Sequence, residues 1–260
     1  GQRNTQHAKE MRKRSMRRKK ARRMRRIKRI FVAAIILLVV FAAGRTSFVQ
    51  GFLNHWNVKS EATLTAEGYP ESLVQLYEKN EEARQFVLDY KKNGNNEQPI
   101  DISSDVTDGK IPLFLQWDER WGYRTYGDNF LAITGCGPTA LSMVYVGLTG
   151  DTSMNPYTVA QMAQEDGFYV NGSGSAWSMM TELATKLGLS AQELSLSEDS
   201  IRQELSQGHP IICIMGPGDF TTSGHFIVLT VNDSNSKKNS KKTWKIDDLM
   251  SQIRDLWVYQ

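Results

Sequence analysis

The chain has 260 residues, of which 40% are hydrophobic and 23% are charged, with only 7 Pro and 20 Gly. This composition excludes collagen-like, Pro/Gly-rich disordered and disulfide-scaffold proteins, and it allows one domain of ordinary size with extensions. Residues 1–30 hold 15 of the 32 Lys and Arg but only one of the 28 Asp and Glu, so the other 230 residues carry 17 basic and 27 acidic groups. The overall charge of +4 therefore belongs to a basic tail, and it does not indicate that the folded part binds nucleic acid.

The basic tail, residues 1–29, is followed by an uncharged apolar run from Ile30 to Gly44. As a helix this run spans about 22 Å, which is short of the roughly 30 Å hydrocarbon core of a bilayer. Flanking Arg29 and Arg45 can extend to the headgroups, and the apolar residues after Arg45 can rest at the interface. We expect a transmembrane signal anchor over residues 30–49 in the lipid bilayer. The positive-inside rule then makes the tail cytoplasmic and the rest of this single-pass protein of the cell membrane extracytoplasmic.

Two other interpretations of this segment stay open. The small residues Ala42, Ala43 and Gly44 suit a signal peptidase, although a basic region of about 29 residues is long for a signal peptide. A nucleic-acid-binding arm is the last choice, because anionic lipid headgroups account for a basic block beside an apolar run. The anchor and the signal peptide agree that the residues after about 45 are exported.

Residues 50–110 are predicted to form a helical stalk and a linker. Apolar residues recur at helical spacing between Pro70 and Tyr90, and the Lys79-Asn80 step is a candidate break between two helices. Residues 91–110 are rich in Asn, Asp, Ser and Gly, which is typical of a linker.

The compact domain is predicted over residues 111–260. Its expected elements are a strand over 111–116, helices over 137–148, 155–165, 176–187 and 199–207, and buried strands over 210–215 and 226–231. Most helices precede most strands, and that order favours an α+β fold with helices packed on a mainly antiparallel sheet.

Cys136 is the first candidate for chemistry, because it lies between Gly135 and Gly137 at the start of an apolar helix. The flanking glycines leave room for another chain to approach the sulfur. A helix N-terminus carries free N–H groups and partial positive charge, which lower a thiol pKa and can hold an oxyanion. These features favour a nucleophile over a buried structural cysteine.

His225 is the candidate partner, because it is expected at the first position of an apolar strand, 89 residues after Cys136. His7, His55 and His209 have no comparable position in the folded domain. A cysteine at a helix start and a histidine at a strand start form the arrangement of thiol catalysis, in which the imidazole takes up and returns the thiol proton. Their order along the chain matches that of papain-like enzymes.

Several segments resemble the bacterial papain-like cysteine peptidases related to the bacteriocin leader (double-glycine) peptidases. The similar segments are Leu115 to Gly122, Gly135 to Ala140, Leu205 to Cys213, Gly216 to Thr221 and Gly224 to Leu229, so the resemblance extends over about residues 111–257. It implies a papain-like fold, peptide or protein substrates, Cys136 as the nucleophile and His225 as the general base and acid.

The resemblance also suggests two further site residues. Gln116 matches the glutamine that stabilises the oxyanion, 20 residues before Cys136, and a polar strand-end residue is the equal alternative. Asp233 matches the acid that orients the histidine, only 8 residues after His225. A straight strand would separate the two by about 26 Å. Either the chain turns early, or another residue orients the imidazole, or the triad is incomplete, which lowers the rate without abolishing it.

The remaining signals are weaker. Cys213 lies within a buried apolar run, which favours a structural role over a disulfide with Cys136. Trp117, Trp121 and Tyr126, with the glycine-rich loop at 172–174, are candidate cleft residues, although packing is the commoner use of such aromatics. We expect no cofactor, no metal and no nucleic-acid partner, because metal-ligand spacing, phosphate loops and nucleic-acid modules are not evident in the sequence.

Three functions are compatible with these sequence features. The first is a membrane-anchored cysteine peptidase that forms a thioester at Cys136. The second is a catalytically weak relative that binds peptides or cell-wall components. The third is an NlpC-type cell-wall endopeptidase or amidase, which also uses a cysteine followed by a histidine. The sequence leaves the oligomeric state open.

Overall fold

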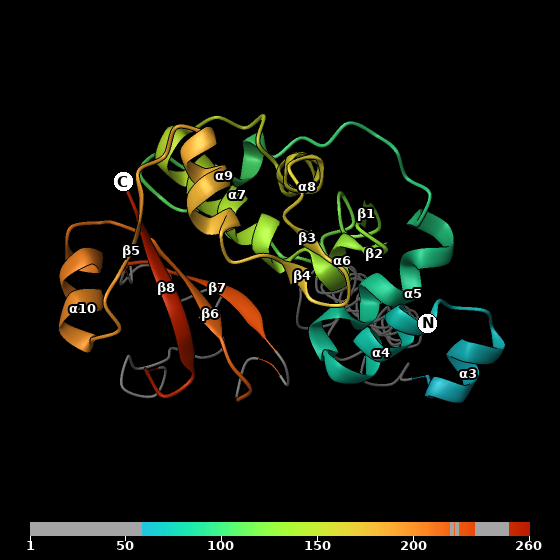
Figure 1. Cartoon of the computed structure of the whole chain (residues 1–260). Helices are drawn as coiled ribbons and strands as arrows, with labels where there is room; N and C mark the ends of the chain where they lie inside the picture. Colours follow the sequence, from blue (N-terminus) through green and yellow to red (C-terminus); the bar gives the residue numbers. More distant parts are fainter. Residues whose placement is uncertain (1–58, 219–220, 222–223, 232–249) are drawn as a thin grey trace, which may run out of the picture. The chain divides into compact units, whose positions relative to one another are not determined.

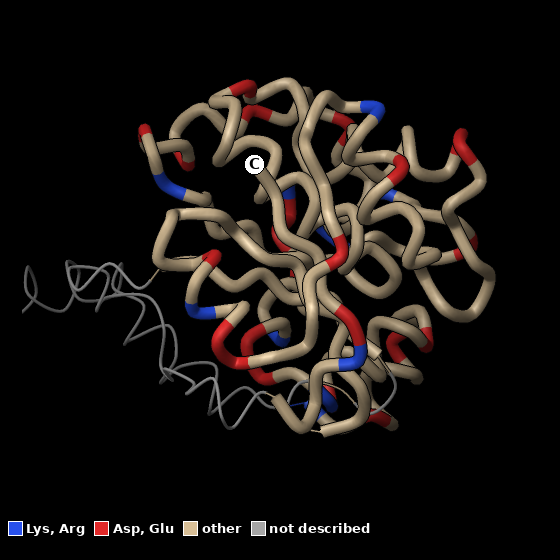
Figure 2. The backbone as a smooth tube through the Cα atoms, turned by 60° about the vertical axis from the view of Figure 1, so that its left-hand side comes forward, with Lys and Arg blue, Asp and Glu red and all other residues tan. Residues whose placement is uncertain are grey.

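The computed structural model describes residues 59–218, 221, 224–231 and 250–260. The predicted tail and anchor, residues 1–49, lie outside the described residues. Within the described ranges, no helix is both long and apolar enough to cross a bilayer. Residues 61–260 form one compact unit (Figure 1), and acidic residues are spread along much of its backbone (Figure 2).

The unit begins with three short helices, α3 (Glu61–Ala66), α4 (Glu71–Lys79) and α5 (Arg84–Asn93). The 3-10 turn η1 (Glu81–Ala83) separates α4 from α5. Asn80 causes this break, because its backbone is extended and its side chain accepts a hydrogen bond from the N–H of Glu82. The predicted interruption at the Lys79-Asn80 step is confirmed.

These helices pack directly on the segment that leads to Cys136. The rings of Phe86 and Tyr123 stack with centroids 4.1 Å apart, and the Tyr123 hydroxyl donates to the Phe86 carbonyl at 2.6 Å. Residues on both sides of position 111 therefore share one hydrophobic cluster, which we call the second cluster. Its buried members are Leu64, Tyr69, Leu73, Val74, Tyr77, Phe86, Val87, Tyr123 and Ala132.

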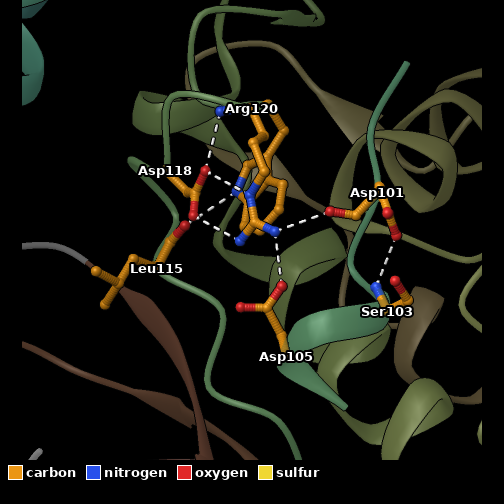
Figure 3. A network of polar contacts seen from close by, with 7 residues as sticks. Asp101, Ser103, Asp105, Leu115, Asp118 and Arg120 are labelled. Atoms are coloured by element: carbon orange, nitrogen blue, oxygen red, sulfur yellow. Dashed lines mark hydrogen bonds and ion pairs between the residues drawn. The ribbon is translucent and has the colours of Figure 1, made fainter. Parts of the chain in front are cut away.

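The predicted linker at 91–110 is also bound to the domain. Ile102 is fully buried in the main core, next to the 3-10 turn η2 (Ser103–Asp105). The Arg120 guanidinium donates to Asp105 Oδ2 at 2.6 Å, to the Asp101 carbonyl at 3.0 Å and to both oxygens of Asp118 (Figure 3). It also lies 4.6 Å above the Trp121 ring. Arg120 thus holds residues 101–105 against the turn at 115–121.

Replacing Arg120 with Ala is expected to lower the free energy of unfolding by about 2 kcal/mol, because several charge-assisted hydrogen bonds on a half-exposed group are lost together. The matched control is Arg202→Ala, which removes an ion pair within one turn of a helix, with an expected cost of about 0.5 kcal/mol. Urea unfolding measures both. Equal small effects would mean that the network does not anchor residues 101–105.

The predicted strand over 111–116 is wrong. The segment does alternate, with Phe114 buried while Leu113 and Leu115 are 62% and 42% exposed. It forms no ladder with another described segment, however, and is therefore not a strand. An alternating pattern predicts an extended backbone, whereas a strand also requires a partner of matching register.

The predicted helices of the domain are confirmed with small shifts in their bounds. They are α7 (Cys136–Thr149), α8 (Pro156–Glu165), α9 (Met179–Lys186) and α10 (Glu198–Ser206). The short helix α6 (Leu131–Thr134) is not among the predicted elements. Asn155 caps α8 by accepting from the N–H groups of Tyr157 and Thr158, and Ser197 caps α10 through Ser200. A short hairpin of β1 (Thr125–Tyr126) and β2 (Asn129–Phe130) precedes α6, and a second hairpin, β3 (Tyr169–Val170) with β4 (Gly174–Ser175), lies between α8 and α9.

The main sheet has four described strands in the order β5, β8, β6, β7, and every pairing is antiparallel. The strands are β5 (Ala191–Glu193), β6 (Ile211–Met215), β7 (His225–Leu229) and β8 (Ile253–Tyr259). The α+β prediction is confirmed. Strands β5 and β8 are not among the predicted elements, although β8 lies between two other strands of the sheet.

The two faces of this sheet belong to different cores. Ile212 and Ile214 of β6 face the main core, which includes residues of α7 and α9, and this is the side on which Figure 1 shows these two helices. The alternate residues of β6 face the third cluster, on the side of α10. The buried members of the third cluster are Ile201, Ile211, Cys213, Met215, Ile253, Leu256 and Val258.

Candidate active site

Cys136 is the first residue of α7, and Gly135 separates it from the short helix α6. Backbone N–H groups of Phe226, Gly137 and Cys136 itself face the sulfur. Two of them belong to the first turn of α7, and the third belongs to β7. The residue remains partly accessible to solvent. The helix start thus places a thiol among backbone donors, where the first N–H groups of a helix have no partner within the helix.

The glycines beside Cys136 serve packing, which corrects the expectation that they leave space for a second chain. A Cβ on Gly137 would lie 2.7 Å from Ser175 Oγ and 2.9 Å from Met179 Cε. A Cβ on Gly135 would lie 2.5 Å from Leu131 Cγ. Side chains of the protein itself therefore occupy this space, and they hold β4 and α6 close to the first turn of α7.

A buried pair of hydroxyl groups, which the sequence did not predict, supports the same turn. The Tyr126 hydroxyl and Ser175 Oγ are 2.8 Å apart, and Tyr126 is fully buried. Burial raises the pKa of Tyr126 to about 12, so its hydroxyl stays neutral at physiological pH. The nearest signal in the sequence is the Gly172-Ser173-Gly174 turn, which predicts a hairpin but does not indicate what the hairpin contacts.

The pKa of the Cys136 thiol is shifted in the direction opposite to the one expected from the sequence. Burial raises the pKa of Cys136 above its ordinary value, and this effect exceeds the lowering by the N–H groups of Phe226, Gly137 and Cys136. Burial also lowers the pKa of His225 below its ordinary value. The resting site near pH 7 therefore holds a neutral thiol and a neutral imidazole, and the prediction of a lowered thiol pKa is wrong.

Alkylation of Cys136 by iodoacetamide is expected to be slow at pH 7 and to reach its half-maximal rate above pH 9, the ordinary value for the thiol. The thiolate is the reactive form, and a raised pKa delays its formation as the pH rises. Mass spectrometry of the modified peptide at several pH values measures the rate. A plateau already reached at pH 7 would show that the thiol is ionised in the free protein.

His225 is the first residue of β7, as predicted. The register pairs it with Met215, whereas the next residue, Phe226, pairs with Ile214. Successive side chains of a strand point to opposite faces, so the side chains of His225 and Phe226 lie on opposite faces of β7. The group of β7 that faces the sulfur is the backbone N–H of Phe226. Among the residues that the structure describes, no hydrogen bond joins the imidazole to the thiol. The structure thus brings Cys136 next to the start of β7 without pairing the two groups.

The other two predicted site residues have different outcomes. Gln116 Nε2 donates to the carbonyls of Leu131 and Ala132, at 3.0 Å each, so both of its N–H bonds are used to hold α6. Its role as an oxyanion donor stays a prediction, and it requires the amide to turn toward Cys136. Asp233 lies outside the described residues, so its distance from His225 also stays a prediction.

The remaining candidates are mostly structural. Cys136 and Cys213 are free cysteines, and Cys213 is fully buried in the third cluster. Trp121 and Tyr126 are fully buried and Trp117 packs against the second cluster, so these aromatics belong to the cores and do not line a cleft. Over the described ranges, no three His, Cys, Asp or Glu residues are grouped as metal ligands.

The model of the Peptidase C39-like family matches residues 109–259, which is more than half of the chain. This range contains Gln116, Cys136, His225 and Asp233. No curated protein and no solved structure matches the chain.

Proposed function

Because the chain belongs to the Peptidase C39-like family, we propose that it hydrolyses peptide bonds with Cys136 as the nucleophile and His225 as the general base and acid. One observation carries the proposal: the Cys136 sulfur lies among three backbone N–H groups, and one of them belongs to the residue that follows His225. A nucleophile, oxyanion donors and a base within one small region are what acyl transfer requires.

In the proposed reaction the sulfur attacks the carbonyl carbon of the substrate while the imidazole takes the thiol proton. The carbonyl oxygen becomes an oxyanion, which the N–H of Cys136 stabilises, with Gln116 as the second proposed donor. The imidazolium then gives its proton to the leaving nitrogen, and the C–N bond breaks to leave a thioester. Water attacks this thioester with its proton passing to the imidazole, and the acid leaves with the thiol restored.

The neutral resting pair fits this sequence of steps. A neutral imidazole is the form that accepts a proton, and a neutral thiol is the form that supplies it. The two groups share no hydrogen bond before substrate arrives, and catalytic hydrogen bonds often tighten only in the substrate complex. We propose that Asp233 or another residue orients the ring at that stage.

A peptide aldehyde tests this proposal, because it forms a thiohemiacetal with an activated thiol and mimics the tetrahedral intermediate. We expect it to inhibit peptide hydrolysis and to protect Cys136 from alkylation. His225→Ala is expected to lower hydrolysis about 10³-fold or more. Cys213 is the internal control, because it is fully buried and its alkylation should not depend on the aldehyde. Hydrolysis that persists in His225→Ala would contradict the proposal.

Two outcomes would favour the alternatives. Release of peptides from peptidoglycan, with no cleavage of casein, would indicate an NlpC-type cell-wall endopeptidase or amidase. Tight peptide binding without hydrolysis and without protection of Cys136 would indicate a catalytically weak binding relative. The binding alternative is tested because the structure shows no hydrogen bond between the Cys136 thiol and the His225 imidazole.

We further propose that residues 30–49 anchor the protein in the cell membrane with the catalytic domain outside the cytoplasm. The support is the apolar run from Ile30 to Gly44 that follows a basic tail. Carbonate extraction and protease treatment of intact cells test this arrangement. The domain should stay with the membrane fraction and should be digested by external protease, whereas its protection from that protease would contradict the orientation.

A further inference from the structure

Trp177 is the most exposed tryptophan among the residues that the structure describes. Its side chain is 48% exposed, whereas Trp257 is 4% exposed and Phe226 is 5% exposed. The Trp177 ring lies edge-on to the Trp257 ring with centroids 6.5 Å apart, and the Phe226 ring is 6.3 Å from the same Trp257 ring. The three rings form a chain, of which Trp177 is the exposed end.

Two observations connect this chain of rings to residues that lie next to the thiol. At the buried end, the backbone N–H of Phe226 faces the Cys136 sulfur. At the exposed end, Trp177 follows two residues after Ser175, whose hydroxyl is packed against Gly137 beside Cys136. The region of Cys136 is thus linked to Trp177 in two ways, through the rings of Phe226 and Trp257 and through the short segment that follows Ser175.

The backbone around Trp177 is held in place. The Trp177 carbonyl accepts a hydrogen bond from the N–H of Met180, and the N–H of Ala176 donates to the Phe168 carbonyl. Met179 and Met180, which start α9, are fully buried. The backbone is thus fixed, and the contact of the half-exposed indole with the Trp257 ring restricts the side chain, so less side-chain freedom is lost when a ligand binds.

The segments around the nucleophile are also free of charge, in contrast to the acidic remainder. Residues 129–150, 167–181, 205–218 and 224–231 contain no Lys, Arg, Asp or Glu. The charged residues coloured in Figure 2 thus lie in other parts of the chain. A charged substrate side chain at Trp177 would lose its hydration without gaining a counter-ion from these segments.

We propose that Trp177 forms an apolar subsite, which selects peptides that carry a large aliphatic or aromatic side chain close to the bond that is cleaved. This inference rests on the proposed peptidase function and adds its substrate class. Burying the exposed indole face against an apolar side chain favours such peptides over those with Ala, Lys or Glu at the same position.

The test begins with wild-type protein and a peptide mixture, whose cleavage products are sequenced by mass spectrometry. We expect large apolar residues to be enriched at one position near the cleaved bond. Two peptides that differ only there, Phe against Ala, then give kcat/KM for each variant. Trp177→Ala should lower kcat/KM at least 10-fold for the Phe peptide and less than 3-fold for the Ala peptide.

Two further variants control the result. Trp177→Phe keeps an apolar ring and should retain most of the preference, which separates lost selectivity from a folding defect. Leu148→Ala removes an apolar side chain of similar exposure, 37%, at the far end of α7 and should leave both peptides unaffected. Cleavage without an apolar preference, or equal losses for both peptides in Trp177→Ala, would overturn the subsite alone. No cleavage at all by the wild-type protein would overturn the peptidase function and this inference with it.

Discussion

Replacing Cys136 with Ala is expected to abolish peptide hydrolysis, with a loss of about 10⁴-fold or more, while the protein stays folded. The activity disappears because the sulfur forms the covalent bond of the proposed thioester. The fold persists because Cys136 is partly accessible and Ala keeps its Cβ, so the free energy of unfolding should change by about 1 kcal/mol or less. Measurements of kcat/KM and thermal unfolding followed by circular dichroism give both quantities.

Cys213→Ala is the matched control for this variant. Cys213 is fully buried in the third cluster, so its truncation leaves a small cavity and should cost about 1–2 kcal/mol of stability while hydrolysis is retained. Cys136→Ala is thus expected to lose hydrolysis and keep its stability, whereas Cys213→Ala is expected to keep hydrolysis and lose stability. If Cys136→Ala unfolded the protein, or if hydrolysis survived in it, Cys136 would be structural and the proposed function would fail.

Removing residues 1–110 is expected to prevent the remaining chain from folding, although residues 109–259 cover the family match. The second cluster would lose seven of its nine buried members and Tyr123 would lose its stacking partner, Phe86. The main core would lose Ile102 and Arg120 would lose Asp105. An exposed apolar surface of this size leads to aggregation or to a molten state.

A chain that starts at residue 59 is the control, and it should unfold cooperatively and retain hydrolysis. The point variant Phe86→Ala tests the same interface in the full chain, with an expected cost of about 3–5 kcal/mol for a buried aromatic side chain. Urea unfolding and near-ultraviolet circular dichroism measure these effects. A well-folded, active fragment of residues 111–260 would show that helices α3 to α5 are a separable stalk.

Local features of the sequence were sufficient for much of the fold. Pro156 with Asn155 starts α8, and Ser197 starts α10, because caps and first-turn residues act within a few positions of one another. The break near Asn80 and the start of β7 at His225 follow from equally short-range signals. The position of Cys136 at the start of an apolar helix was also predicted from short-range signals.

Features that depend on contacts between distant segments were harder to predict from the sequence. Strand β8 contains Arg254 and Asp255 and lacks the continuous apolar run of β6, so its place between two other strands depends on pairing across the sheet. Segment 111–116 alternates like a strand but has no partner among the described residues. The Asn- and Asp-rich composition of residues 91–110 predicts a linker and does not indicate that Ile102 is buried in the main core. One apolar residue is enough to attach a polar segment to a core.

The amino-acid sequence alone was enough to indicate the α+β class, the helix that begins at Cys136, the strand that begins at His225 and the resemblance to a peptidase family, since each depends on neighbours in the chain. Only the tertiary structure decided that burial raises the pKa of the Cys136 thiol and lowers that of the His225 imidazole, that Gln116 holds α6, and that Trp177 is exposed. These properties depend on which distant segments remove water from a group or occupy its hydrogen bonds, and periodicity and spacing carry no information about either.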